Sequence, residues 1–332
     1  MAELSPIRKR QFGQTGLHVS EFGLGCARIG GIFKQNPTDF VELLTAALEA
    51  GINFFDTADI YSQGESERLL ARAFRKRRDD VIIASKAGFV LPSQRLVVAR
   101  LKPFVRPLIR LLGLSRRQVP GVVRGSLSQD FTARHLRLSV ERSLRRLQTD
   151  RLDLFQLHSP PTSVVEAGEW VEALETLKRS GKIRYYGISC DMPDAAVAAL
   201  EFSSVSSIQV PLNLLDRRAE AVSARAGERG VAVIARECLA NGLLIKEVSN
   251  TDIRSYCQSD DEAAAKAAQL VAYRRAAADA GATVTQMALD FVTHLAGVGV
   301  TLVGVSTIGQ LRELLSSGIS LAARRGSAPQ SA

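Results

Sequence analysis

The feature that most constrains the fold is a regular alternation of short apolar runs with longer amphipathic segments. The apolar runs predict buried strands at 22–24, 52–55, 81–84, 152–157, 184–188, 207–210, 231–235 and 300–303. Apolar residues at helical spacing predict helices at 37–50, 64–74, 132–147, 164–179, 193–202, 216–228, 262–280, 284–295 and from 308 onward. Eight strand and helix units in this order predict an α/β (β/α)8 TIM barrel. The main rival is a doubly wound dinucleotide fold, but no GxGxxG opens a helix after any strand.

The first part of the chain, residues 10–25, holds two short apolar segments around a Gln-Thr-Gly turn, which predicts a hairpin before the barrel. A length of 332 residues with 46% hydrophobic content suits one α/β barrel, and no break in composition favours two domains. We therefore expect one barrel domain over 1–320, followed by a disordered tail over 321–332. The segment 87–131 is far longer than a usual loop between a strand and a helix, and we interpret it as a functional or mobile insertion.

The formal charge of +9 comes from one stretch, 81–129, which largely overlaps this insertion. Residues 81–129 contain nine basic residues and no Asp or Glu, while the rest of the chain is balanced. Within it, residues 94–113 place apolar residues on one helical face and basic ones opposite, with Pro103 and Pro107 breaking the helix. A lid over the site is the first interpretation, peripheral contact with an anionic membrane the second, and a protein or dimer contact the third. No nucleic-acid recognition motif accompanies the basic residues.

The four cysteines lie far apart and have no histidine at zinc-ligand spacing, so we expect free buried thiols and no metal site. The basic start of the chain has no apolar run behind it, and no segment reaches the length of a membrane span. These observations predict a soluble cytoplasmic protein. Monomer is the default oligomeric state.

Four polar residues stand at or just after three neighbouring strands of the predicted barrel. Asp56 and Tyr61 follow the second strand, Lys86 the third and His158 the fourth. Each has an ordinary alternative: a turn or helix cap, a rim aromatic, a solvated charge and a loop histidine, respectively. Packing alone does not explain their joint placement, because the carboxyl ends of barrel strands form the active-site face.

This set of side chains suits proton transfer coupled to charge development on oxygen. A tyrosine with a pKa of ~10 is a poor acid or base at neutral pH, and a lysine ammonium beside it lowers that pKa. Asp56 would hold Lys86 charged and in place, and His158 would donate to or orient a carbonyl oxygen. Such a site could reduce C=O or oxidise CH–OH, given a hydride source that the residues themselves do not show.

Five segments resemble the aldo-keto reductase family: DTADIYSQGESERLL (56–70), IIASKAG (82–88), LFQLHSPP (154–161), IRYYGISC (183–190) and LVGVSTIGQLRE (302–313). The resemblance implies that Asp56, Tyr61, Lys86 and His158 are the family's catalytic tetrad. It also implies that Tyr61 is the general acid in reduction and the base in oxidation, and that the hydride comes from C4 of a nicotinamide. The substrate would be a small aldehyde, ketone, sugar or alcohol. A weakly catalytic barrel that senses bound nicotinamide for a membrane or protein partner is the alternative.

The same resemblance assigns cofactor contacts. Ser189 and Gln209 match the residues that hold the nicotinamide carboxamide, Cys190 replaces the usual asparagine, and Arg236 replaces the stacking tyrosine, which favours the reduced cofactor. Leu239 and Gly242 match the loop over the pyrophosphate. Glu237 beside them needs Arg236 or Lys246 as an ion-pair partner. The places near the adenosine hold Gly304, Ser306, Thr307, Gln310 and Glu313. We expect NADP(H) from the habit of the family, with NAD(H) as the rival because these places lack a basic residue.

Overall fold

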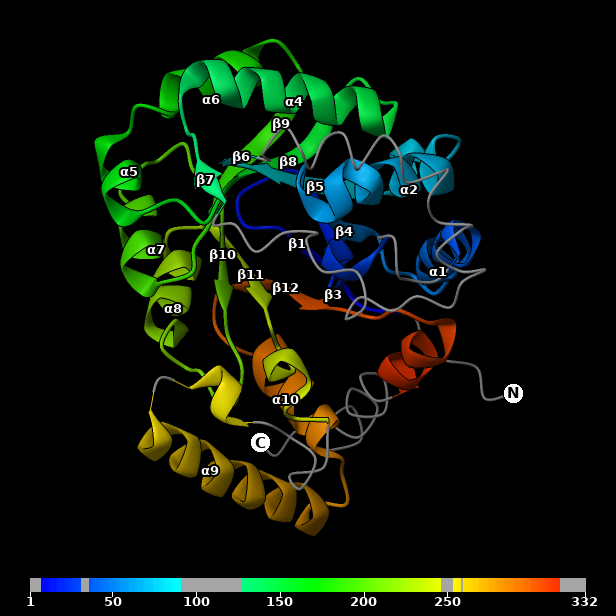
Figure 1. The fold of residues 1–332 in the computed structure, drawn as a ribbon, viewed down its shortest axis with the longest axis vertical. Helices are drawn as coiled ribbons and strands as arrows, with labels where there is room; N and C mark the ends of the chain where they lie inside the picture. Colours follow the sequence, from blue (N-terminus) through cyan, green and yellow to red (C-terminus); the bar gives the residue numbers. More distant parts are fainter. Residues whose placement is uncertain (1–6, 31–35, 91–126, 246–252, 258, 317–332) are drawn as a thin grey trace, which may run out of the picture.

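The computed structural model describes residues 7–30, 36–90, 127–245, 253–257 and 259–316. Eight parallel strands close into a barrel, in the order β10, β11, β12, β3, β4, β5, β8, β9, and helices surround it (Figure 1). The strands are β3 (Phe22–Gly25), β4 (Phe54–Asp56), β5 (Ile82–Ala87), β8 (Leu152–His158), β9 (Ile183–Ser189), β10 (Ser207–Pro211), β11 (Ala232–Arg236) and β12 (Val298–Val303). The predicted (β/α)8 TIM barrel is therefore confirmed.

The helices that cover the barrel are α1 (Pro37–Glu49), α2 (Glu65–Phe74), α4 (Ala133–Leu147), α5 (Thr162–Ala167), α6 (Val171–Arg179), α7 (Pro193–Ala199), α8 (Glu220–Glu228), α9 (Asp260–Asp279) and α10 (Val284–Thr293). A last helix covers 308–316. The long α9 packs on α10 at the outside of the ring (Figure 1). Short 3-10 helices are η1 (Cys26–Arg28), η2 (Tyr61–Gly64), η3 (Arg78–Asp80), η4 (Ala240–Gly242) and η6 (Ile253–Tyr256).

Two predicted helices differ from the structure. The single helix expected over 164–179 is two helices, α5 and α6, because Gly168 takes a left-handed φ of 68° and ends the first one. The helix expected from 216 begins at Glu220 instead. There the side chain of Asn213 accepts hydrogen bonds from the backbone N–H groups of Leu215 and Asp216, which holds these residues in a turn.

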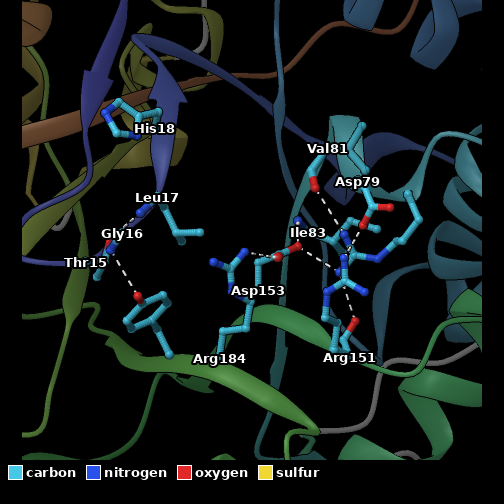
Figure 2. Close-up of polar contacts among 12 residues, drawn as sticks. Thr15, Gly16, Leu17, His18, Asp79, Val81, Ile83, Arg151, Asp153 and Arg184 are labelled. Atoms are coloured by element: carbon cyan, nitrogen blue, oxygen red, sulfur yellow. Dashed lines mark hydrogen bonds and ion pairs between the residues drawn. The ribbon is translucent and has the colours of Figure 1, made fainter.

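The predicted hairpin, β1 (Lys9–Gln11) and β2 (His18–Ser20), closes the barrel at the end where the strands begin. Its side chains Phe12, Leu17 and Val19 are buried and join the apolar cluster inside the barrel. Around this floor the Tyr185 hydroxyl accepts a hydrogen bond from the N–H of Gly16, and Arg184 pairs with the buried Asp153 (Figure 2). The floor is thus held by polar contacts at its edge and apolar packing at its centre, which leaves the opposite end for a site.

The insertion over 87–131 lies mostly outside the described residues, so its amphipathic helices and its roles as lid or membrane contact stay predictions. The same holds for the tail over 321–332. The described ends of the insertion form a short antiparallel ribbon of β6 (Phe89–Val90) and β7 (Ser128–Gln129). This ribbon begins directly after β5, so the insertion leaves and re-enters the barrel at the C-terminal ends of the strands.

Candidate active site

The inward-facing positions of the barrel strands change from apolar to polar toward the C-terminal ends. Side chains two residues apart on a strand face the same side, so the residue two positions after each apolar inward residue also faces inward. From the interior toward the mouth these pairs are Phe54 and Asp56, Ala84 and Lys86, Leu154 and Gln156, and Ile234 and Arg236. The predicted strand at 81–84 extends three residues further than expected, and Lys86 lies within it. A strand therefore fixes the lysine more rigidly than a loop could.

Lys86 and Asp56 form a buried ion pair at the centre of the mouth. Lys86 is fully buried, and its Nζ donates to Asp56 Oδ2 at 2.5 Å and to the carbonyl oxygen of Thr57 at 3.0 Å. The other carboxylate oxygen accepts from the amides of Gln209 at 2.9 Å and Gln156 at 3.3 Å. Burial alone would lower the pKa of Lys86, but the Asp56 carboxylate and the Tyr61 phenol outweigh it and raise that pKa. The lysine is therefore held as an ammonium ion.

Tyr61 and His158 complete the group that the sequence predicted. The Lys86 Nζ lies 5.2 Å from the centroid of the Tyr61 ring, and the Tyr61 and His158 rings meet edge to face at 5.7 Å. Burial lowers the pKa of His158 well below its ordinary value, with the charges of Lys86 and Arg236 acting in the same direction. The imidazole is therefore neutral at neutral pH. Its Nδ1 is buried and has no hydrogen-bond partner among the described residues.

The pKa of Tyr61 differs from the sequence prediction. Lys86 does lower it, as expected, but burial raises it more, and the net direction is upward. The predicted effect of the ammonium is therefore present, and the upward net direction comes from desolvation, which the prediction did not consider. The phenol stays protonated at neutral pH and lies beside a positive charge, which suits a proton donor.

Ser189 and Gln209 lie together beside this group, both almost fully buried. The Ser189 hydroxyl donates to Gln209 Oε1 at 3.1 Å, and the Gln209 amide nitrogen donates to Asp56 as described above. The neighbouring Cys190 is also buried, and burial raises the pKa of its thiol to about 12, so it carries no charge. The hydroxyl of Ser189 and the amide of Gln209 fit the carboxamide that a nicotinamide would present.

Arg236 is held by acidic residues on two loops. Its Nη2 donates to Asp191 Oδ1 at 2.5 Å and to the carbonyl oxygen of Cys190 at 3.2 Å, while its Nη1 donates to Glu237. The ion pair that the sequence required for Glu237 is present, and Arg236 is its partner. Lys246, the other candidate, lies outside the described residues. Sequence analysis did not single out Asp191, although it stands in the loop directly after Ser189 and Cys190.

The remaining predicted cofactor contacts follow the last two strands of the barrel. Leu239 and Gly242 belong to a tight loop in which Glu237, Ala240, Asn241 and Gly242 all have positive φ. After β12, the N–H of Ser306 donates to Gln310 Oε1 at 2.8 Å, and the N–H of Gln310 donates to Thr307 Oγ1 at 3.1 Å. Gly304 and Glu313 are exposed on either side. The structure places these residues around the start of the last helix, where backbone donors favour an anion.

Three further residues contact this group and were not predicted. Gln156 reaches Asp56, and a polar residue at an inward position of an apolar strand was the signal for it. Phe89 packs its ring against His158 at 4.9 Å from the other side. Gln129 donates to the carbonyl oxygen of Ser159 at 2.8 Å. Phe89 and Gln129 belong to the β6–β7 ribbon, so the ends of the insertion touch the site.

The cysteines and charged clusters add no further site within the described ranges. All four cysteines are free, three of them buried and Cys257 half-buried. The described residues include no group of three His, Cys, Asp or Glu side chains that could hold a metal ion. No helix in the described part of the chain has the length and apolar character needed to cross a membrane.

Comparison with known proteins agrees with this geometry. The sequence model of the aldo/keto reductase family matches residues 21–323. An uncharacterized oxidoreductase of Bacillus subtilis, YqkF, is 31% identical over 92% of this chain and 90% of its own. The L-galactose dehydrogenase of Arabidopsis thaliana is 27% identical over 93% of this chain and 88% of its own. The aldo-keto reductase AKR11C1 of Bacillus halodurans, in its holo form, superposes with a TM-score of 0.75 at 29% identity, covering 94% and 90% of the two chains. The chain therefore belongs to the aldo/keto reductase family of NAD(P)-dependent oxidoreductases that act on carbonyl and alcohol groups.

Proposed function

We propose that this protein interconverts a small carbonyl compound and its alcohol with NADP(H), and that Tyr61 is the general acid and base. The observation that carries the proposal is the fully buried Lys86, paired with Asp56 at 2.5 Å and lying 5.2 Å from the Tyr61 ring. A buried ion pair is expensive to maintain for stability alone. Its position against a phenol at the mouth of the barrel supports a role in proton transfer.

Each residue of the group has a distinct task in this proposal. Tyr61 gives its proton to the carbonyl oxygen during reduction, and the Lys86 ammonium stabilises the phenolate that remains. Asp56 keeps Lys86 charged and fixed. The neutral His158 donates an N–H to the same oxygen and so orients the carbonyl without adding charge. When bound, the nicotinamide supplies the hydride in reduction and accepts it in oxidation.

Ser189 and Gln209 would hold the carboxamide of the nicotinamide in this proposal, with Cys190 at their side. Arg236 would stack on the nicotinamide ring, and Leu239 and Gly242 would line the path of the pyrophosphate. Gly304, Ser306, Thr307, Gln310 and Glu313 would face the adenosine. NADP(H) is supported by the hydroxyl donors Ser306 and Thr307 and by the exposed Arg312 on the helix that follows them. The ratio of kcat/KM with NADPH and NADH tests this choice, and a clear preference for NADH would overturn it.

The substrate panel should include aldehydes, ketones, quinones and sugars. Sugars are included because two relatives are named L-galactose dehydrogenase and D-threo-aldose 1-dehydrogenase. Oxidation of NADPH is followed with each carbonyl, and reduction of NADP⁺ with each sugar or alcohol. The proposal predicts turnover of at least one compound. If no member of the panel is turned over, the proposed activity fails.

Replacing Tyr61 with Phe removes the proton and keeps the ring. We expect kcat to fall by roughly a hundredfold or more, the usual contribution of a general acid, while NADPH still binds. The matched control is Tyr185→Phe, because the Tyr185 hydroxyl accepts from the N–H of Gly16 at the opposite end of the barrel. Tyr185→Phe should leave kcat within about twofold, since it removes one partly exposed hydrogen bond far from the mouth. Undiminished kcat in Tyr61→Phe would refute the role of the phenol.

A further inference from the structure

A second buried charged cluster lies behind the loop that carries Tyr61. Glu67 of α2 is fully buried; its Oε2 accepts from Arg146 Nε of α4 at 2.5 Å, and its Oε1 accepts from Ser85 Oγ of β5 at 2.8 Å. Arg146 also donates to Ser143 at 3.1 Å. This ion pair lies between the barrel wall and the helices. Its contact on β5 is Ser85, the residue next to Lys86. The pair is not part of the site group described above.

Asp59 brings a second carboxyl group to this pair. Its residue belongs to the loop between β4 and η2, and its N–H donates to the carbonyl oxygen of Lys86 at 3.0 Å. The charged groups that act on its carboxyl are Glu67 from α2 and Arg146 from α4, and the hydroxyl of Ser139, also on α4, acts on it as well. Ser139 in turn contacts His135 on the same helix at 3.3 Å. Two carboxyl groups therefore lie within the influence of one guanidinium, which is paired with Glu67.

The position of Asp59 disfavours its ionised form. Its Oδ1 is buried and has no hydrogen-bond partner among the described residues, so a negative charge on this oxygen would lack a donor. Arg146 already binds Glu67, which also receives a second donor from Ser85. Burial, followed by the like charge of Glu67, raises the pKa of Asp59 to about 7, although Arg146, the backbone N–H of Ile60 and the hydroxyl of Ser139 act against the rise. A neutral Asp59 is thus the better fit to this environment.

Asp59 is also tied closely to the phenol. The N–H of Tyr61 donates to the carbonyl oxygen of Ala58 at 3.1 Å, so the residues on either side of Asp59 form one tight turn. The two residues after Tyr61, Ser62 and Gln63, have left-handed φ values of 50° and 56°. Such backbone persists only where the surroundings hold it in place. A change in the contacts of Asp59 is therefore carried directly to the position of Tyr61.

We propose that Asp59 is a positioning residue for Tyr61. The neutral carboxyl of Asp59 packs against the Glu67–Arg146 ion pair. Its ionisation displaces the Tyr61 turn and slows the reaction. This inference rests on the proposed function for its effect on rate. The proton on the Asp59 carboxyl is required for the reaction but is not transferred to the substrate. The rate of the reaction should accordingly fall as pH rises through about 7, because the productive form is the protonated one.

The test compares pH–rate profiles of the parent protein with Asp59→Asn, which is permanently neutral and nearly isosteric. For the parent we expect kcat to fall by about tenfold between roughly pH 6 and pH 8, as one required proton is lost. Near pH 6 the kcat of Asp59→Asn should lie within about twofold of the parent's kcat. The variant should not show the fall in kcat between roughly pH 6 and pH 8. A step that persists unchanged in Asp59→Asn would overturn the proposal. The exposed Asp279→Asn serves as the matched control and should keep the parent profile.

A second variant and a second readout keep the test independent of folding and of activity. Glu67→Gln removes the like charge and leaves Arg146 unneutralised, so the step should move to lower pH. Carboxyl ¹³C NMR on aspartate-labelled protein, assigned through Asp59→Asn, reports the titration of Asp59 directly and needs no turnover. If the Asp59 resonance titrates near the ordinary pKa of an aspartate carboxyl, the inference is refuted even if the enzyme is active. A titration near neutral pH in a protein that turns over no carbonyl would instead refute only the proposed function.

Discussion

Asp56→Asn is the change that most directly tests the buried ion pair at the mouth. The substitution keeps the size of the side chain and removes its charge. An asparagine that keeps its oxygen toward the amides of Gln209 and Gln156 turns its own NH2 toward the Lys86 ammonium. The reverse orientation turns that NH2 toward the two glutamine amides. Either way, donors face donors and the buried ammonium loses its counter-ion.

The expected loss of stability is large. Breaking a buried ion pair by removing one partner destabilises proteins by about 3–5 kcal/mol, because the remaining charge stays buried and uncompensated. Lys86 is fully buried and the Asp56 side chain is only 5% exposed, so this pair belongs to that class. We therefore expect Asp56→Asn to lower the free energy of unfolding by about 3 kcal/mol or more near neutral pH.

The dependence of this loss on pH distinguishes a charge effect from a packing effect. In the parent protein the folded-state pKa of Lys86 is raised, so its contribution is fully present below the unfolded value of 10.5 and is lost only as pH rises through the folded value. Without Asp56, burial lowers the folded-state pKa of Lys86 below 10.5. The unfolded chain then binds the proton more readily, and the stability of the variant rises with pH. The deficit should shrink above neutral pH, by at most about 1.4 kcal/mol per pH unit.

Urea unfolding followed by far-UV circular dichroism at several pH values measures both quantities. Glu220→Gln is the matched control, because it makes the same chemical change in the exposed Arg217–Glu220 pair, 2.7 Å long. That control should lose less than about 1 kcal/mol. A loss below about 1 kcal/mol in Asp56→Asn, or a larger loss that does not change with pH, would refute the reasoning that a buried charge has been left unpaired.

Two further predictions concern the edges of the site. Gly64 has a φ of 78°, and an added Cβ would lie 2.6 Å from Arg146 Cδ, so Gly64→Ala should lose about 1–3 kcal/mol of unfolding free energy. Gly181, with a φ of 73° and open space around it, is the control, and equal losses in the two variants would show that the contact with Arg146 is unimportant. Arg236→Gln should lower the preference for NADPH over NADP⁺ by roughly two- to fivefold, since it removes a positive charge that disfavours the oxidised ring. Fluorescence titration with both cofactors measures this preference, and an unchanged ratio would contradict the role of that charge.

The placement of the four polar side chains was predictable because it follows from closure of the barrel. Asp56 and His158 are a hundred residues apart, yet parallel strands must end at one rim, and residue parity along β4 and β8 decides which side chains face inward. The strands themselves were visible as apolar runs. Local sequence pattern and topology together therefore fixed where Lys86, Asp56 and His158 meet.

Other features depend on contacts that no local pattern contains. The break between α5 and α6 depends on Gly168, whose close neighbour is the ring of Phe202 on a distant loop. The pair of Arg236 with Asp191 joins the end of β11 to a loop 45 residues away, and that loop has no periodicity to interpret. The net rise in the pKa of Tyr61 depends on desolvation, which is set by the finished fold. Sequence reasoning identified the charged neighbours of the phenol but could not weigh them against burial.

The two buried ion pairs are joined through a single strand. Successive residues of a strand point to opposite faces, so Lys86 reaches Asp56 inside the barrel while Ser85 reaches Glu67 outside it. The turn from Asp56 to Tyr61 passes between these two layers and is bonded to the backbone of β5 at Ala84 and Lys86. A change of charge at the outer Glu67–Arg146 pair thus acts on the same backbone that holds the inner Lys86–Asp56 pair. For this reason substitutions of Arg146, on a helix outside the barrel, should alter the reaction at its mouth without any contact with substrate.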